Sequence, residues 1–175
     1  MNLQLQDKII LVSGGAKGIG EGISQLLAQE GAIPIIIGRN QKDNEQLVQE
    51  LIGKGFQADQ VVAELAHPEA CEKAIQSIIQ KYGRIDGLVN NAGVNDGVGL
   101  ENGSYEKFLE SLHKNVVHYY LLAHHALPYL KKSKGSIVNI SSKTADTGQG
   151  GTSAYAASNG GRNRSEEHTS ELQSH

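Results

Sequence analysis

The chain has 175 residues, with 16 Lys or Arg, 19 Asp or Glu and a formal net charge of −3 at pH 7. This length allows one domain with a substantial core, and the mixed, slightly acidic charge excludes a basic surface for nucleic acid or an anionic membrane. There is no signal-peptide pattern, no apolar run near the roughly 20 residues of a membrane helix, and no disulfide partner for Cys71, so we expect a cytoplasmic protein without nucleic-acid or membrane partners.

Short apolar runs alternate with longer amphipathic segments. The apolar runs predict strands at residues 8–13, 33–38, 56–63, 85–90 and 135–141. Apolar residues at helical spacing predict intervening helices at residues 20–30, 43–54, 68–83 and 104–130. Alternation of this kind implies right-handed crossovers, so the predicted fold is α/β, a Rossmann-like doubly wound parallel sheet of about five strands.

A glycine-rich turn, SGGAKGIG at residues 13–20, joins the first predicted strand to the first predicted helix. Glycines in this place allow a tight turn and a close approach of the backbone to a pyrophosphate, which rests on the helix N-terminus. We therefore predict that Gly14, Gly18, Ile19 and Gly20 contact a dinucleotide. The alternative is an ordinary strand–helix turn with no ligand.

The end of the second strand indicates which dinucleotide is bound. A carboxylate there would bind the ribose 2′-hydroxyl of NAD. This chain has Gly38 in that place, followed by Arg39, and Lys17 lies within the glycine turn. Two cations and no carboxylate favour the 2′-phosphate of NADP, with NAD as a possible second cofactor. The alternative is that both cations are solvated surface charges.

Taken together, these residues resemble the short-chain dehydrogenase/reductase family over residues 1–163. The glycine turn resembles the cofactor motif of that family, and NNAG at residues 90–93 resembles its structural signature beside the cofactor. The resemblance implies cofactor contacts from Asn91, Ala92 and Gly93. It further implies a nicotinamide cofactor, a small-molecule alcohol, ketone or sugar substrate, and a homo-oligomeric full-length parent.

Three further residues resemble the active site of the family. Asn115 matches its asparagine, which kinks a helix and holds a water of the proton relay. Ser142, which would orient the substrate carbonyl, is followed thirteen residues later by Tyr155, the acid/base. For Tyr155 the alternative is a buried aromatic side chain with a satisfied hydroxyl. Hydride would pass between the nicotinamide and a secondary alcohol or carbonyl carbon.

The chain departs from the family at Asn159, where the family pattern Y-x-x-x-K has lysine. A cation about 6 Å from a phenol, at an effective dielectric constant of ~20, contributes about 2.8 kcal/mol. Asn159 is expected to remain a catalytic-site residue that keeps hydrogen bonds to the nicotinamide ribose, but it supplies no such charge. Either the enzyme is impaired or another cation substitutes, and the candidates are Arg162, on the same helix face as Tyr155, and Lys143.

Two stretches, NNAGVNDGVGLENG at residues 90–103 and SSKTADTGQGGTSAYAASNGGRN at residues 141–163, also resemble a branch of the family that oxidises L-fucose and similar aldoses. The polar GQGGTS within the second stretch lies where a hydroxyl-rich substrate would be contacted. The expected function is therefore that of an NAD(P)-dependent oxidoreductase, with a sugar as the candidate substrate. The alternative is a non-catalytic nucleotide-binding module or an inactive fragment, because the lysine is missing at Asn159 and the domain is expected to be truncated.

The last segment, RSEEHTSELQS at residues 164–174, resembles the in-frame translation of a common sequencing-library adapter. We therefore expect a partial dinucleotide-binding domain at residues 1–163 and a non-native tail at residues 164–175. The tail would interrupt the helix that carries Tyr155. On this interpretation the 175-residue chain itself is an inactive, poorly soluble fragment.

The remaining polar residues of note have less specific interpretations. Glu64 is expected either to contact the adenine or to cap the helix that follows. His113, His118, His124 and His125 are expected at the surface or at a subunit interface. No spacing of metal ligands is present, and we predict no metal site.

Overall fold

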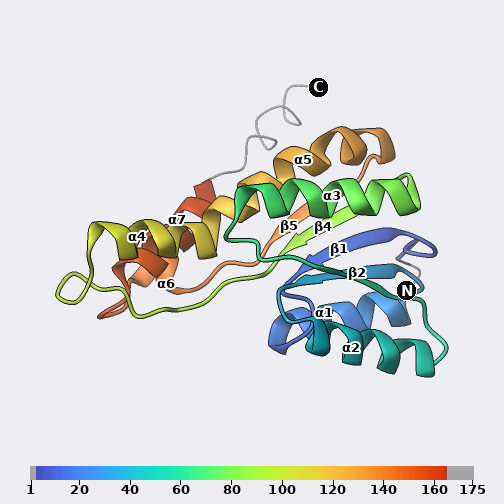
Figure 1. Ribbon diagram of the computed structural model, residues 1–175, viewed down its shortest axis with the longest axis horizontal. Helices are drawn as coiled ribbons and strands as arrows, with labels where there is room; N and C mark the ends of the chain where they lie inside the picture. The colour runs from blue at the N-terminus through green and yellow to red at the C-terminus, as the bar shows by residue number, and fades with distance from the viewer. Residues whose placement is uncertain (1–2, 165–175) are drawn as a thin grey trace.

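The computed structural model describes residues 3–164, which form a five-stranded parallel sheet with helices on both faces (Figure 1). The strands are β1 (Ile9–Ser13), β2 (Ile33–Gly38), β3 (Asp59–Val62), β4 (Gly87–Asn90) and β5 (Ser136–Asn139). Their order is β3-β2-β1-β4-β5, and all neighbouring pairs are parallel. From β1 the chain builds the sheet outward through β2 and β3, and it then returns to build the other side through β4 and β5. This change of direction beside β1 confirms the predicted doubly wound topology.

The helices form two layers and one smaller group (Figure 1). One face of the sheet is covered by α1 (Gly18–Gln29) and α2 (Gln41–Gly53), and the other by α3 (Pro68–Tyr82) and α5 (His118–Ser133). The smaller group consists of α4 (Tyr105–Leu112), α6 (Thr144–Thr147) and α7 (Ser153–Arg164), which contact one another beyond the ends of the strands.

Burial on both faces explains why the central strands are continuous apolar runs. In β2, Ile35 and Ile37 pack in the cluster that includes α3 and α5, whereas Ile36 between them packs against α2. All five residues of β1 are buried as well. In β5, by contrast, Ile137 packs on the α3 side while Val138 is 49% exposed. The pattern of β5 is therefore that of a strand with one covered face.

The long helix expected at residues 104–130 is not continuous. It consists of α4, a π-helical segment at His113–Val117 and α5. A π segment adds one residue to the turn and alters the backbone hydrogen bonding there. Asn115 lies at the centre of this segment, in the helix that the family resemblance predicted to be kinked.

Smaller differences concern the ends of elements. Helix α2 begins at Gln41, before the expected start, because the Asn40 side chain caps it by accepting a hydrogen bond from the Asp43 amide at 3.3 Å. Strand β3 is shorter than expected, and α6 was not predicted. Within residues 3–164, no helix is long and apolar enough to cross a membrane. The predicted tail, apart from Arg164 at the end of α7, lies outside the described residues.

Candidate dinucleotide-binding and active site

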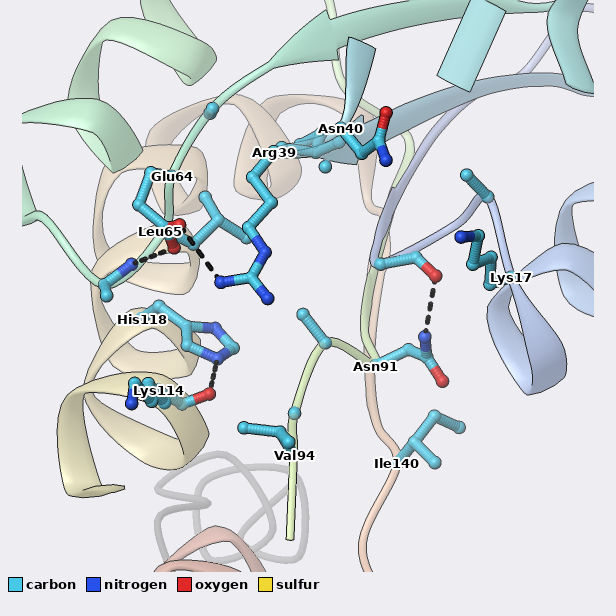
Figure 2. Close-up of a pocket in the computed structure, with 18 of the residues that line it drawn as sticks. Lys17, Arg39, Asn40, Glu64, Leu65, Asn91, Val94, Lys114, His118 and Ile140 are labelled. Carbon is cyan, nitrogen blue, oxygen red and sulfur yellow. Dashed lines mark hydrogen bonds and ion pairs between the residues drawn. The ribbon is translucent and has the colours of Figure 1, made fainter. Parts of the chain in front are cut away.

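A cavity of about 740 Å³ lies at the carboxyl ends of the strands (Figure 2). Its volume is within the range of small-molecule sites, and its place beside β1 is where doubly wound sheets bind ligands. The predicted cofactor residues that line it are Gly14, Lys17, Ile19, Arg39, Glu64, Asn91, Ala92 and Gly93. Gly18 and Gly20 do not line it directly. Of the predicted catalytic residues, Tyr155 lines the cavity, together with Arg162.

The glycine turn lies under one side of this cavity. Gly14 has a φ of 64°, a left-handed conformation that favours glycine. Gly20 lies so close to the turn that a Cβ there would be 2.2 Å from the Gly14 carbonyl oxygen. Lys17, the N-cap of α1, makes no side-chain capping bond. The first amides of α1 are therefore not satisfied by that side chain, which suits an anionic ligand.

Substituting Gly20→Ala should distort the glycine turn, because the added methyl group meets backbone that cannot rotate away. We expect a loss of about 2 kcal/mol in the free energy of unfolding and weaker dinucleotide binding. Urea denaturation and NADPH fluorescence titration measure the two effects. Gly22→Ala is the matched control, since a Cβ at Gly22 meets no atom within 4 Å. Equal behaviour of the two variants would contradict the prediction.

Asn91 has a structural role that the sequence did not reveal. Its side-chain amide donates to the backbone oxygens of Ser13 at 3.0 Å and Gly14 at 3.2 Å. In return, the Ser13 hydroxyl accepts hydrogen bonds from the amides of Asn91 at 2.9 Å and Ala92 at 3.0 Å. The segment after β4 is thus tied to the glycine turn, and the polar Ser13 that ends β1 was the available indication of this contact.

Both predicted phosphate-binding cations lie against carboxylates of the cavity wall. Lys17 Nζ is 2.7 Å from Asp43 Oδ2, and Arg39 Nη1 is 3.4 Å from Glu64 Oε2. The side chains of Lys17 and Arg39 are 73% and 75% exposed, so these ion pairs are weak and exchangeable. A dianionic phosphate can therefore replace the carboxylates, and the donor set fits NADP.

The structure does not show Glu64 as a helix cap. Its Oε1 accepts a 3.5 Å hydrogen bond from the Ala66 amide, whereas the N-cap of α3 is His67 and makes no side-chain capping bond. Glu64 lines the cavity instead. The contact of Glu64 with the adenine stays a prediction.

Of the predicted Ser142–Tyr155 pair, only Tyr155 is among the residues that line the cavity. Tyr155 lines the cavity from the first turn of α7. Ser142 is not among the lining residues that the structure describes, and its Oγ accepts hydrogen bonds from Thr144 N at 3.3 Å and Thr144 Oγ1 at 3.0 Å. The adjacent Ser141 does line the cavity, and its hydroxyl donates to the Asn159 carbonyl at 3.3 Å.

Arg162 joins α7 to the π-helical segment. Its Nε donates to the carbonyl oxygen of Asn115 at 2.6 Å, and its Nη1 donates to Ile140 O at 3.0 Å and Asn159 Oδ1 at 2.8 Å. The guanidinium carbon lies 4.1 Å from the centre of the Tyr119 ring, and burial lowers the Arg162 pKa. Because Arg162 is only 3% exposed yet lines the cavity, it places a positive charge inside the site.

The two asparagines of the site are fully buried. Asn115 Oδ1 accepts a hydrogen bond from the Val94 amide at 2.8 Å, and its Nδ2 donates to Ser111 O at 3.0 Å. Asn159 Nδ2 donates to the Tyr155 carbonyl at 2.8 Å. Neither side chain lines the cavity, so both support residues that do. Lys143, the other candidate cation, is exposed at the start of α6.

The placement of His118 corrects the expectation that the four histidines lie at the surface. His118 is 1% exposed and lines the cavity. Desolvation by burial lowers its pKa from 6.5 to about 4. Of the others, His124 is exposed, while His113 and His125 are partly exposed. Residues 3–164 contain no group of three or more side chains that could hold a metal ion.

Comparison with known proteins agrees with this fold. The family model for short chain dehydrogenases matches residues 8–174. Over 161 residues the chain is 35% identical to the 3-oxoacyl-[acyl-carrier-protein] reductase FabG of Thermotoga maritima, covering 91% of this chain and 65% of the relative. It is 31% identical to the L-fucose dehydrogenase of Bos taurus over 161 residues, covering 91% of this chain and 58% of the relative.

Solved structures show the same architecture. The crystal structure of the Cj0485 dehydrogenase has a TM-score of 0.84 and 41% identity, covering 93% of this chain and 62% of that one. A metagenomic short-chain oxidoreductase in complex with NADP has a TM-score of 0.89 and 28% identity, covering 96% of this chain and 77% of that one.

The parallel sheet, the glycine turn and the tyrosine on the cavity wall define a Rossmann-like fold with a candidate dinucleotide site. The chain belongs to the short chain dehydrogenase family. It spans 65% and 58% of the lengths of the two relatives described above.

Proposed function

We propose that this site binds NADP and serves reversible hydride transfer between its nicotinamide and a secondary alcohol or carbonyl carbon. The observation that carries the proposal is that Tyr155 and the glycine turn border one cavity. NADP supplies the hydride acceptor or donor when it is bound. The Tyr155 hydroxyl exchanges the proton with the substrate oxygen, and the glycine turn holds the pyrophosphate.

Two neighbouring serines, Ser141 and Ser142, are candidates for the residue that orients the substrate oxygen. The family resemblance assigns this role to Ser142, whereas Ser141 is the serine that lines the cavity. Ser142→Ala and Ser141→Ala, introduced into a chain completed with the C-terminal segment of the Thermotoga maritima relative, separate the two assignments. The orienting residue is the one whose loss lowers turnover without weakening NADPH binding.

We propose Arg162, rather than Lys143, as the cation that stands in for the lysine of the family. Arg162 is buried and lines the cavity. Its guanidinium donates a hydrogen bond to Asn159, the residue that occupies the sequence position of that lysine. Lys143 is exposed outside the cavity lining. Arg162→Lys retains the charge and Arg162→Met removes it. A difference in turnover between these variants at equal NADPH affinity reports on the charge.

Arg39→Ala is expected to weaken NADP binding by about tenfold and NAD binding by less than about twofold. The physical reason is the loss of a charge-assisted contact to the 2′-phosphate, which NAD lacks. Calorimetric dissociation constants for both dinucleotides measure this. Lys42→Ala, an exposed cation outside the cavity lining, is the control. A parallel loss of both affinities would show that Arg39 does not read the phosphate.

For the substrate we propose an aldose of the L-fucose type. The support is the resemblance of residues 90–103 and 141–163, the polar character of residues 148–153, and the L-fucose dehydrogenases among the relatives. The FabG relatives make a 3-oxoacyl thioester the competing substrate.

The test measures NADPH binding by the 175-residue chain and then turnover with aldoses and 3-oxoacyl thioesters. The same assay is applied to a chimera completed with the C-terminal segment of the Thermotoga maritima relative. Turnover with an aldose supports the proposal. NADPH binding without turnover in either chain would favour a non-catalytic nucleotide-binding module, the alternative suggested by Asn159.

A further inference from the structure

His118 is a buried imidazole in the cavity wall, within electrostatic reach of both Glu64 and Arg162. Figure 2 shows it beside Glu64 and Leu65, with Lys17 and Asn91 across the cavity. The proton-transfer chemistry proposed for Tyr155 does not use this side chain. Nevertheless, a histidine that is 1% exposed in a cavity wall requires a physical explanation.

The hydrogen bond of the Nε2 atom determines the tautomer of His118. Nε2 lies 2.9 Å from the carbonyl oxygen of Lys114. A carbonyl oxygen only accepts hydrogen bonds, so Nε2 must carry the hydrogen. Burial holds the His118 pKa at about 4, and the ring is therefore neutral near pH 7. Nδ1 then has a lone pair and no hydrogen, which makes it an acceptor.

Nδ1 is also a buried atom that lacks a hydrogen-bond partner within residues 3–164. Leaving such an acceptor without a donor is unfavourable, and a bound ligand with a suitably placed N–H group would satisfy it. Figure 2 shows the Nδ1 edge directed away from the Lys114 carbonyl, on the side of Arg39. The exposed Arg39 side chain, held there by its 3.4 Å contact to Glu64, can move when a ligand enters.

The proposed cofactor would place its base at this side of the cavity. With the pyrophosphate on the glycine turn and the 2′-phosphate at Arg39, the base would lie beyond Arg39, at the part of the lining that contains Leu65 and His118. Adenine presents an exocyclic amino group, a donor. Hypoxanthine presents a carbonyl oxygen at the same position. Because this oxygen and the unprotonated Nδ1 are both acceptors, they cannot form a hydrogen bond with each other.

We propose that His118 Nδ1 accepts a hydrogen bond from the adenine amino group and so selects adenine over 6-oxopurine dinucleotides. The inference rests on the proposed NADP binding and deepens it by naming a residue that determines base specificity. Glu64, whose carboxylate contacts Arg39 and the Ala66 amide, is a second acceptor at this side of the cavity.

The test compares NADP with nicotinamide hypoxanthine dinucleotide phosphate, using calorimetric dissociation constants for the 175-residue chain. We expect the unaltered chain to bind NADP about tenfold more tightly than the analogue. In His118→Leu, which removes the acceptor at similar size, the preference should fall below about twofold, mainly through weaker NADP binding. The control His124→Leu makes the same change on an exposed histidine and should keep the full preference.

Three outcomes distinguish the inference from the proposed function. Loss of the preference in His118→Leu alone supports the inference. An unchanged preference, with NADP still bound, overturns the inference and leaves the proposed function standing. Absence of binding by either dinucleotide to the unaltered chain overturns both.

A nitrogen-15 NMR measurement on the unaltered chain needs no folded variant. The His118 Nδ1 resonance should be that of an unprotonated nitrogen, and it should shift toward hydrogen-bonded values with NADP but not with the hypoxanthine analogue. Equal shifts with the two ligands would overturn the inference.

Discussion

Replacing Arg162 with methionine is expected to lower the free energy of unfolding by about 3 kcal/mol. The substitution removes the donors to the carbonyls of Asn115 and Ile140 and to the side chain of Asn159, leaving buried acceptors unsatisfied. It also removes the cation from the face of the Tyr119 ring. Relief of the desolvation of the guanidinium offsets part of the loss. Urea denaturation followed by circular dichroism measures the change.

Two variants make this measurement specific. Arg164→Met changes an exposed arginine of the same helix and should alter stability by less than about 0.5 kcal/mol. The loss of stability in Arg162→Lys should lie between the losses in Arg162→Met and Arg164→Met. A single ammonium group cannot reach every acceptor that the planar guanidinium contacts. If Arg162→Met unfolds at the same urea concentration as Arg164→Met, Arg162 is not the connection between α7 and the π-helical segment.

Acidification from pH 6.5 to pH 4 is expected to cost about 3 kcal/mol of folding stability through His118 alone. The pKa of His118 is about 4 in the folded chain and 6.5 in the reference state. Between these values the unfolded chain binds a proton that the folded chain does not. This contribution is therefore fully present above pH 6.5 and is lost as the pH falls toward 4.

The difference between the unaltered chain and His118→Leu isolates this contribution. Urea denaturation at pH 7.0, 5.5 and 4.0 should show a shallower loss of stability in His118→Leu, whereas His124→Leu should follow the unaltered chain. Asp59 and Asp86, whose pKa values lie below 3.8 because of their cationic partners, retain their charge over most of this range. Identical pH dependence in the unaltered chain and His118→Leu would show that His118 is not buried as a neutral ring.

The order of strands and helices could be predicted from the sequence because the burial of an element determines its pattern of apolar residues. Strands covered on both faces must be apolar at consecutive positions, as in β1 and β2, and parallel neighbours need helical crossovers. The glycine turn was also readable, since only glycine fits the close approach between Gly14 and Gly20. Both signals are local, and the family motifs follow the same order along the chain.

The ties among distant residues became visible only in the tertiary structure. Sequence spacing placed Arg162 on the helix face of Tyr155 but could not show that its guanidinium binds the Asn115 carbonyl, 47 residues away. Likewise, the carboxylate partners of Lys17 and Arg39 come from α2 and from the segment after β3. Such contacts depend on how the elements pack and not on any local pattern.

His118 shows the physical limit of helical periodicity most clearly. A pattern of 3.6 residues per turn assigns faces correctly only while the helix is regular. The π-helical segment at His113–Val117 inserts an extra residue and rotates everything after it, so faces counted from residue 104 no longer apply at α5. The sequence by itself determined the sheet, the glycine turn and the family motifs. Packing around the π segment decided which histidine and which arginine enter the cavity, because burial of a side chain depends on what lies across from it.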